Sequence, residues 1–461
     1  MDTNIFREYD IRGVVGEQLT NETVVKVTRA IGTFFAQHDA RIIAIGYDAR
    51  ESSRPFYGML TEALLASGRQ VVQLGMVPTP VLYHTVHTKE VDGGVMITGS
   101  HNPPHHNGFK IALGTTTLFG SQIQEIREIA ERPMPPSVPG YPQEGVVNKL
   151  DVLPEYLSDI ASSVSMGSRK LRVVVDGGNG MGGVTAVPLY EKLGVKLIKL
   201  YTEPDSTFPN HLPDPTVEAN LQDLIAAVRD HNADVGLAFD GDGDRIGVVD
   251  ETGRIIWGDE LMILLSREIL AVHPGSTIIA EVKCSQTLFD DIELRGGTAV
   301  MERAGHSIIK SAMKRTGAKL AGEMSGHIFF ADRFYGFDDA TYAGARLLEI
   351  LSKTDKPLSR LFEGIPQTFS TPELRVDCPD SIKFDVVERV ADHFAQTHKV
   401  ITIDGARIIF NHGWGLVRAS NTQAILVLRF EADSPDHLAS IRSEVESVVN
   451  ATVQKLETRN S

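Results

Sequence analysis

Cysteine is scarce in this chain, and it has neither a long apolar run nor an excess of basic residues. The 461 residues include two cysteines, Cys284 and Cys378, which suit neither a disulfide framework nor a zinc site. No apolar run approaches the roughly 20 residues that cross a membrane. The first residues, MDTNIFREYD, lack the basic and apolar regions of a signal peptide. We therefore expect a cytoplasmic protein with no membrane partner.

The charge balance argues against nucleic acid as a partner. A formal net charge of −15 at pH 7 disfavours non-specific binding to a polyanion. An acidic protein that handles small anionic substrates needs a local cluster of arginine and lysine instead. The length of 461 residues predicts about three domains at roughly 150 residues each.

Strand and helix patterns alternate through most of the chain. A strand pattern at residues 41–47 leads to a helical pattern over 55–67, then Gly68 and a second strand pattern at 70–75. The same order of strand, helix and glycine recurs twice. One repeat starts at the strand pattern LRVVVD and has Gly194 after its helix, and the other starts at STIIAEV and has Gly296 after its helix. Glycine is favoured where a helix stops. The alternation predicts an α/β protein with three similar α/β domains, whose mixed, largely parallel sheets are covered by helices.

The C-terminal quarter has a different pattern. ITIDGARIIF, GWGLVR and AILVLRF each predict a strand, and helical patterns flank them at residues 381–396 and 435–455. Short links favour an antiparallel sheet, which predicts an α+β domain. A proline-rich stretch at residues 133–142 predicts a linker. The predicted domains span residues 1–146, 147–254, 255–366 and 367–461.

The first of four polar loops carries Ser100, at the end of the strand pattern GGVMIT. Glycine and proline around it predict a turn that holds the hydroxyl toward a cleft outside the strand ends. His101 and Lys110 nearby support a catalytic role only modestly, and the residues alone favour a serine that hydrogen-bonds the backbone of its own turn. No G-x-S-x-G elbow is present, so the usual α/β-hydrolase signature is missing.

The second loop is more specific, with Asp240, Asp242 and Asp244 separated by single glycines and followed by Arg245. Clustered anions are unfavourable unless a cation neutralises them, and hard oxygen ligands suit Mg²⁺ or Ca²⁺. We exclude a calcium EF-hand, because its glycine position is Arg245 and because strand patterns flank the loop. Arg245 beside these carboxylates suits a phosphate oxygen.

Two further loops carry weaker signals. GEMSGH at residues 322–327 groups Glu323, Ser325 and His327 among small residues. A carboxylate can accept from two neighbouring sugar hydroxyls, but the residues alone favour a polar surface turn. RASNT at residues 418–422 puts one cation and three hydrogen-bonding side chains together. That set fits a phosphate clamp and an ordinary hairpin turn equally well.

A glycine-rich stretch supports a rival interpretation. Gly178, Gly180 and Gly183 satisfy G-x-G-x-x-G after a strand pattern, and Glu203 lies about where a ribose-binding acid would be. A nucleotide-binding oxidoreductase would have this arrangement. The motif alone is weak, however, and this rival leaves the aspartate-rich loop unexplained. The structural alternative is a tight strand–helix turn.

Taken together, the motifs resemble the bacterial phosphomannomutase/phosphoglucomutase family of the α-D-phosphohexomutase superfamily. The resemblance runs nearly end to end, and the serine and metal motifs in this order are highly specific. It is carried by YDIRG (9–13), TGSHNPP (98–104), NGFK (107–110), DGDGDR (240–245), EVKCS (281–285), AGHS (304–307), GEMSGH (322–327) and RASNT (418–422).

The resemblance implies four domains around a central cleft, with one loop from each. Ser100 would be the phosphoserine and would hold Mg²⁺ together with the three loop aspartates. Glu323 and Ser325 would bind the sugar O3 and O4 hydroxyls. The other implied site residues are a phosphate-binding set of Arg418, Ser420, Asn421 and Thr422 and a cleft lining of Tyr9, Arg12, Lys110, Arg245, Lys283, His306 and His327.

The implied reaction converts hexose 1-phosphate into hexose 6-phosphate through a 1,6-bisphosphate, with glucose 1,6-bisphosphate as primer. The general base stays open among His101, Lys110 and His327. Glucose and mannose differ at C2, so a site that reads O3 and O4 should accept both. Met324, where phosphoglucosamine mutases usually have glutamine, favours the same two sugars. A phosphoglucosamine mutase and a Mg²⁺-dependent sugar phosphatase remain alternatives. We expect a monomer that binds small sugar phosphates.

Overall fold

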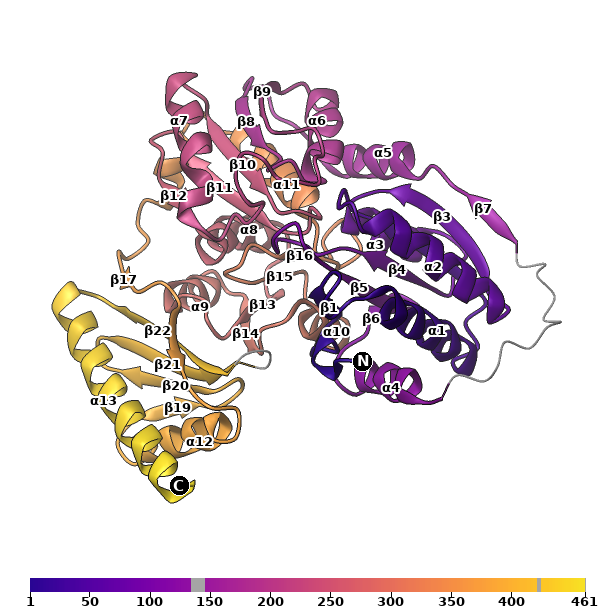
Figure 1. Ribbon diagram of the computed structural model, residues 1–461. Helices are drawn as coiled ribbons and strands as arrows, with labels where there is room; N and C mark the ends of the chain where they lie inside the picture. The colour runs from indigo at the N-terminus through magenta and orange to yellow at the C-terminus, as the bar shows by residue number, and fades with distance from the viewer. Residues whose placement is uncertain (134–145, 421–423, 461) are drawn as a thin grey trace.

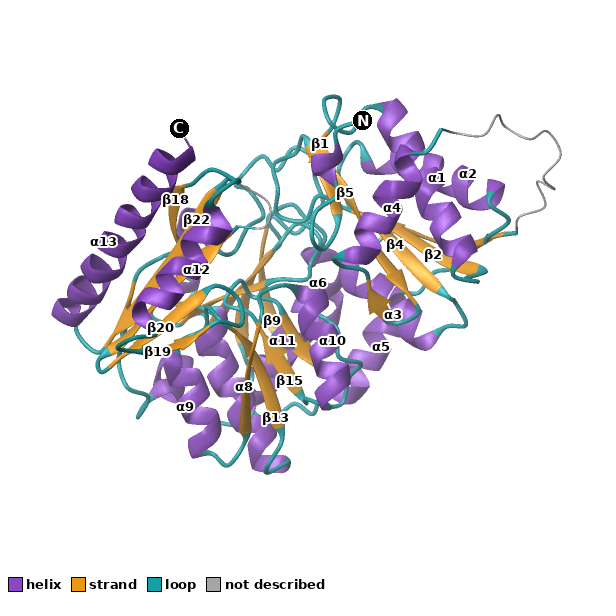
Figure 2. Ribbon diagram, turned by 90° about the horizontal axis from the view of Figure 1, so that it is seen from below, coloured by secondary structure: helices purple, strands orange, loops and turns teal. Residues whose placement is uncertain are grey.

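The computed structural model describes residues 1–133, 146–420 and 424–460. Four sheets with their helices follow one another along the chain, and the orange and yellow C-terminal unit lies to one side of the other three (Figure 1). The linker predicted at residues 133–142 lies, except for Pro133, outside the described residues. Loops from the four units gather near the middle of the molecule (Figure 2).

The first unit is a sheet in the order β1-β5-β4-β2-β3-β7, with β6 beside β5. Its elements are β1 (Ile11–Val14), α1 (Asn21–Gln37), β2 (Ile42–Tyr47), α2 (Ser53–Ala66), β3 (Gln70–Met76), α3 (Thr79–Thr88), β4 (Gly93–Ile97), β5 (His106–Leu113), β6 (Thr116–Thr117), α4 (Ser121–Glu131) and β7 (Val147–Lys149). The central strands are parallel, whereas β1 and β5 are antiparallel to their neighbours. Helices α1, α2 and α4 share one apolar core with this sheet.

The second and third units repeat the strand–helix scheme on smaller sheets, ordered β12-β11-β10-β8-β9 and β14-β13-β15-β16. The second contains α5 (Leu153–Ser163), β8 (Arg172–Asp176), α6 (Gly182–Lys192), β9 (Lys196–Leu200), α7 (Gln222–Asp230), β10 (Val235–Phe239), β11 (Ile246–Asp250) and β12 (Ile255–Ile256). The third contains α8 (Gly258–Val272), β13 (Thr277–Glu281), α9 (Gln286–Leu294), β14 (Thr298–Glu302), α10 (His306–Thr316), β15 (Leu320–Gly322), β16 (Ile328–Phe330) and α11 (Ala340–Ser352).

One apolar core runs from the first unit into the other two. It joins Met96 on β4 to Tyr156 on α5, Leu237 on β10 and Leu347 on α11. Helix α11 follows the third sheet in sequence but also packs on the second unit, where Tyr190 donates a hydrogen bond to the carbonyl of Thr341 at 3.0 Å. Shared burial of this extent makes the first three units one rigid support for their loops.

The fourth unit has its own core and an antiparallel sheet, in the order β17-β22-β21-β20-β19 with β18 beside β22. Its elements are β17 (Phe369–Ser370), β18 (Leu374–Asp377), α12 (Lys383–Phe394), β19 (Lys399–Ile401), β20 (Ala406–Phe410), β21 (Gly413–Ala419), β22 (Ile425–Ala432) and α13 (Pro435–Asn460). Both helices pack on the sheet (Figure 1). The predicted fold class, three α/β units followed by a C-terminal antiparallel sheet, is confirmed.

Local sequence rules account for where the helices end. Gly68, Gly194 and Gly296 each follow a helix with φ of +78°, +79° and +77°, in the left-handed region that glycine adopts without a side-chain clash. One expected strand was wrong. ITIDGARIIF is not a single strand, because the chain turns at Gly405 (φ +91°) and splits it into the antiparallel pair β19 and β20.

The fourth unit docks on the third through a buried arginine. Arg407 is fully buried and stacks 3.8 Å from the ring of Trp414, and its guanidinium donates to the carbonyls of Val282 and Cys284 beyond the end of β13. Arg429 on β22 also donates to a carbonyl of this segment, that of Lys283. No helix among the described residues is long and apolar enough to span a membrane.

We expect Arg407→Ala to lower the stability of the fourth unit by about 3 kcal/mol, because two buried carbonyls lose a charged donor. Thermal unfolding, monitored by limited proteolysis of the C-terminal unit at increasing temperature, would measure the loss. Arg389→Ala, at an exposed position of α12, is the matched control. Equal melting behaviour of the two variants would contradict a docking role for Arg407.

Candidate active site

The four predicted loops have a common origin in the fold. Each connects two neighbouring antiparallel strands: β4 to β5, β10 to β11, β15 to β16, and β21 to β22. The first three loops meet directly, since the carbonyl of Ser100 lies against Gly241 and the backbone of Ile246 donates to Gly326. The fourth includes Asn421 and Thr422, which lie outside the described residues.

Ser100 is held in a constrained position at the first loop. Its φ is +48° and it is 2% exposed, while its amide donates to Thr98 Oγ1 at 2.8 Å. Its Oγ donates to Asp240 Oδ2 at 2.9 Å and lies 3.1 Å from His101 Nδ1. A non-glycine residue with positive φ is uncommon and is often found where geometry serves function.

Arg50 holds this loop in place through hydrogen bonds, and this role of Arg50 was not predicted. Its guanidinium donates to the backbone carbonyls of Ser100, Asn102, Pro103 and His106, at 2.5–3.1 Å. Asp48 pairs with the same guanidinium and also accepts from the amide of Gly99. The sequence did offer one signal, because Asp48 and Arg50 are two charged residues that come directly after the strand at residues 42–47. Functional loops often begin at such a strand end.

The aspartate-rich loop places three fully buried carboxylates against Ser100. Oxygen atoms of Asp240, Asp242 and Asp244 all lie within 4.8 Å of one another. Asp242 Oδ2 accepts from Thr79 at 2.5 Å and from Lys110 at 2.7 Å, whereas its Oδ1 has no hydrogen-bond partner. A buried, unpartnered carboxylate oxygen in an all-oxygen cluster fits a hard divalent cation such as Mg²⁺.

The surrounding charges shift the pKa values of Asp240 and Asp244 in opposite directions. Burial and the neighbouring carboxylates raise the pKa of Asp240 well above its usual value. Burial also opposes ionisation of Asp244, but Lys110 at 2.5 Å and His327 outweigh it and hold that pKa well below the usual value. Lys110 therefore neutralises part of the charge that a metal ion would otherwise meet.

Two histidines of the site are held in opposite protonation states. Burial and the nearby Arg245 lower the pKa of His101 well below its usual value, so its imidazole is neutral. Burial acts the same way on His327, but the carboxylates of Asp244 and Glu323 outweigh it and raise the pKa of His327 to about 9. A neutral acceptor and a charged donor thus line the same cavity as Ser100.

The third loop is tied to an adjacent backbone segment. Glu323 accepts from the amide of Gly305 at 2.6 Å, from His327 at 2.7 Å and from Ser325 at 3.0 Å. Burial opposes its ionisation, but the hydrogen bond and charge of His327 lower the pKa of Glu323 to about 2. This carboxylate is therefore ionised and already oriented.

The remaining predicted residues lie around these loops. Tyr9 donates to the carbonyl of Ala304 at 2.7 Å and its ring packs against His306. Arg418 pairs at 3.0 Å with Asp404, which also accepts from the amide of Ala304. Lys283 pairs with Glu373 at 2.7 Å and with Glu281 at 3.4 Å. Asp404 and Glu373 were not predicted.

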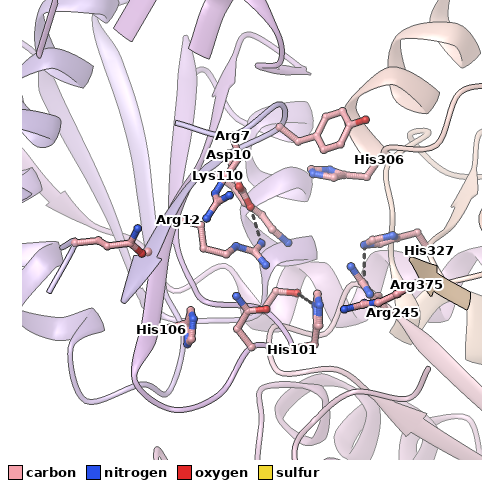
Figure 3. Close-up of a pocket in the computed structure, with 15 residues that line it drawn as sticks. Arg7, Asp10, Arg12, His101, His106, Lys110, Arg245, His306, His327 and Arg375 are labelled. Atoms are coloured by element: carbon pink, nitrogen blue, oxygen red, sulfur yellow. Dashed lines mark hydrogen bonds and ion pairs between the residues drawn. The ribbon is translucent and has the colours of Figure 1, made fainter. Parts of the chain in front are cut away.

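A cavity of about 470 Å³ opens beside Ser100 and is mostly basic. In Figure 3 Arg12 and His106 stand on the left of this cavity, and Arg245, His327 and Arg375 stand on the right. Arg12 is paired with Asp10 at 2.5 Å. Arg7, His106 and Arg375 also line the cavity and were not predicted, and Arg375 reaches it from the fourth unit. The local cluster of cations expected in an acidic protein is present.

The glycine-rich stretch at residues 178–183 has a structural role. A Cβ on Gly180 would lie 2.7 Å from the backbone of Gly241, and one on Gly183 would lie 2.2 Å from the carbonyl of Thr202. The amide of Met181 also donates to the carbonyl of Gly241 at 3.0 Å. Gly180 therefore lets the turn after β8 pack against the aspartate-rich loop, and Gly183 lets it pack against the segment after β9, as the strand–helix turn interpretation requires.

Comparison with protein families finds matches along most of the chain. The matching models describe phosphoglucomutase/phosphomannomutase alpha/beta/alpha domain I at residues 3–135, domain II at 154–253 and domain III at 257–369, and the C-terminal domain at 373–448. A phosphomannomutase/phosphoglucomutase of Pseudomonas aeruginosa is 46% identical over 458 residues, covering 99% of this chain and 97% of that protein.

Two solved structures share the fold of this chain. A phosphoglucomutase/phosphomannomutase family protein of Burkholderia thailandensis has a TM-score of 0.91 and 40% identity, and 98% of each chain is covered. An Aspergillus fumigatus N-acetylphosphoglucosamine mutase, solved in complex with GlcNAc-6P and magnesium, shares the fold at a TM-score of 0.58 and 15% identity, over 89% of this chain and 77% of that one.

We expect Gly241→Ala to reduce activity by about 100-fold or more, because its Cβ would lie 2.3 Å from the carbonyl of Ser100 and push the two loops apart. Steady-state kinetics would measure the loss, and circular dichroism would check folding. Gly58→Ala on α2, where a Cβ meets nothing within 4 Å, is the control. Wild-type kinetics for Gly241→Ala would contradict the close approach.

Proposed function

We infer the reaction from one premise: the chain belongs to the phosphoglucomutase/phosphomannomutase family of the α-D-phosphohexomutase superfamily. Its activity is that of a phosphomannomutase/phosphoglucomutase, an isomerase that interconverts hexose phosphates. We propose that Ser100 carries the transferred phosphoryl group. The observation behind this assignment is the 2.9 Å contact of Ser100 Oγ with Asp240 beside a basic cavity.

The proposed transfer begins with phosphorylated Ser100. A free hydroxyl oxygen of hexose 1-phosphate bonds to phosphorus as the bond from phosphorus to Ser100 Oγ breaks, which gives the 1,6-bisphosphate. The hydroxyl proton passes to a base, and Oγ takes up a proton. After the bisphosphate reverses its orientation, Oγ attacks the other phosphorus, loses its proton and regains a phosphoryl group. The freed sugar oxygen is protonated, and hexose 6-phosphate leaves.

Asp240, Asp242 and Asp244 would hold Mg²⁺ together with an oxygen of the phosphoserine. Support for this assignment comes from the all-oxygen cluster and the unpartnered Asp242 Oδ1. Bound there, Mg²⁺ would supply Lewis-acid stabilisation of the charge that develops on Oγ. Arg245 adds a donor suited to the phosphoryl oxygens, and it is fixed near this loop by the bond from its amide to Asp240 at 3.1 Å.

The proton acceptor is one of His101, Lys110 and His327. His101 combines a Nδ1 atom 3.1 Å from Ser100 Oγ with a pKa well below its usual value, which suits a neutral acceptor. Lys110 and His327 are both held in their charged forms by neighbouring carboxylates, which suits donation to a developing negative charge. His306 is neutral, because burial and Lys310 lower its pKa, and it lines the same cavity.

Glu323 and Ser325 would bind the sugar O3 and O4 hydroxyls, so glucose and mannose would both fit. The phosphate that is not reacting would be bound by Arg418, Ser420, Asn421 and Thr422, and the cleft would be lined further by Tyr9, Arg12 and Lys283. Glucose 1,6-bisphosphate would prime the enzyme by phosphorylating Ser100. We also propose that the enzyme is a monomer.

A coupled assay tests this function. Purified protein, Mg²⁺ and a trace of glucose 1,6-bisphosphate would receive glucose, mannose or glucosamine 1-phosphate in parallel. Formation of glucose and mannose 6-phosphates, lost on chelation, is the expected result. Turnover of glucosamine 1-phosphate alone would indicate a phosphoglucosamine mutase. Free phosphate without any 6-phosphate would indicate a phosphatase.

In that assay we expect Ser100→Ala to lose at least about 1,000-fold in turnover while sugar phosphate still binds, because the nucleophile alone is removed. Calorimetric binding of glucose 6-phosphate would separate the two effects. Ser121→Ala, at an exposed position where α4 begins, is the control. Retained turnover in Ser100→Ala would rule out the phosphoserine mechanism.

We also expect Lys110→Met to make stability depend strongly on Mg²⁺. Lys110 pairs with Asp242 and Asp244, so its loss leaves buried charge unpaired, at a cost of roughly 3–5 kcal/mol. Melting in chelator and in saturating Mg²⁺ would measure this, with the more exposed Lys89→Met as control. A deficit that Mg²⁺ does not reduce would contradict cation binding by these carboxylates.

A further inference from the structure

Two histidines and an aspartate meet at the outer end of the fourth unit. His412 lies in the turn between β20 and β21, Asp433 directly follows β22, and His437 is in the first turn of α13. The register of β21 and β22 pairs Gly413 with Ala432, which brings residues 412 and 433 together. The amide of Asp433 donates to the carbonyl of His412 at 3.0 Å. The backbone therefore fixes these three side chains relative to one another.

The imidazoles of His412 and His437 both contact the carboxylate of Asp433 through their Nδ1 atoms. Nδ1 of His412 lies 2.9 Å from Asp433 Oδ2, and Nδ1 of His437 lies 2.5 Å from Asp433 Oδ1. The two rings stack, with centroids 3.9 Å apart and planes 13° apart.

The set has the composition and spacing of a transition-metal site. Two imidazole nitrogens and one carboxylate oxygen lie within 4.8 Å of one another. Bonds of about 2.0–2.2 Å to a tetrahedral Zn²⁺ place ligand atoms roughly 3.3–3.6 Å apart, so small side-chain movements would suffice. The side chains are about half exposed, at 54%, 54% and 43%, which leaves room for solvent as a fourth ligand.

We propose that His412, Asp433 and His437 form a surface site for a divalent transition-metal ion, with Zn²⁺ as the ion to test first. Each neutral imidazole binds through Nδ1 and carries its remaining proton on Nε2. Imidazole favours Zn²⁺, Cu²⁺ and Ni²⁺ over Mg²⁺ and Ca²⁺, so the chemistry differs from that of the oxygen-only cluster at Asp240. A bound ion would clamp the turn before β21 to the start of α13.

The site is separate from the candidate active site. It lies at the N-terminal end of β21, whereas Arg418 and the loop that follows it lie at the C-terminal end of the same strand. The other two possible metal-binding groups among the described residues both include Asp244 and belong to the candidate active site. A metal bound at His412 is therefore expected to change stability, while mutase turnover stays the same.

Calorimetric titration of the full chain with Zn²⁺, in saturating Mg²⁺, tests the proposal. We expect the wild type to bind one more equivalent of Zn²⁺ than the double variant His412→Gln and His437→Gln. Each single variant should weaken this binding by more than the roughly 10- to 100-fold typical of an outer-shell change. Zn²⁺ should also raise the melting temperature of the wild type only.

The control is His393→Gln, at an exposed histidine of α12 in the same unit, which should titrate like the wild type. Circular dichroism and mutase turnover would check that every variant is folded. Equal Zn²⁺ stoichiometry and affinity in the wild type and the double variant would overturn the proposal. In that case the three side chains would form a hydrogen-bonded cluster that binds no metal ion.

Discussion

Three buried carboxylates packed within 4.8 Å of each other are the constraint on which the candidate active site depends. Such a cluster is unfavourable unless cations surround it. Lys110 reaches it from β5, the charge of Arg245 acts on Asp240 from the same loop, and His327 reaches it from the third unit. The first three units therefore have to meet at this point, and the apolar core that they share is the packing that lets them do so.

Close backbone approach is the second requirement of the same site. The aspartate-rich loop lies between the carbonyl of Ser100 on one side and the glycine turn after β8 on the other, at distances that leave no space for a Cβ. Glycine at 180 and 241 is thus a consequence of packing three loops around one serine. This accounts for a motif that resembles a nucleotide-binding fingerprint without requiring a nucleotide.

The sequence predicted what is local and missed what depends on tertiary contacts. The three aspartates lie in a short, unusual motif at a strand end, so pattern and chemistry pointed to them. Ser100 was singled out only by the family resemblance, because its residues alone favoured an ordinary turn serine. Arg50, Asp404 and Arg375 are charged residues without a motif. The contacts that bring them to the site are with distant residues: Arg50 with the carbonyl of Ser100, 50 positions away, and Asp404 with the amide of Ala304 in the third unit, while Arg375 reaches the cavity from the fourth unit. The expected strand at residues 401–410 failed for a related reason: its apolar pattern continues through a turn that Gly405 makes possible.

The distribution of charge connects the fold to the proposed reaction. The chain has a net charge of −15, yet its cavity presents Arg7 and Arg12 from the first unit, Arg245 from the second and Arg375 from the fourth. A hexose 1,6-bisphosphate carries roughly −3 to −4, because each phosphate contributes about −1.5 to −2. Cations drawn from several units can neutralise both ends of such a molecule, whichever end faces Ser100. A single cationic patch on one unit would favour one orientation, whereas the proposed mechanism requires both in every turnover.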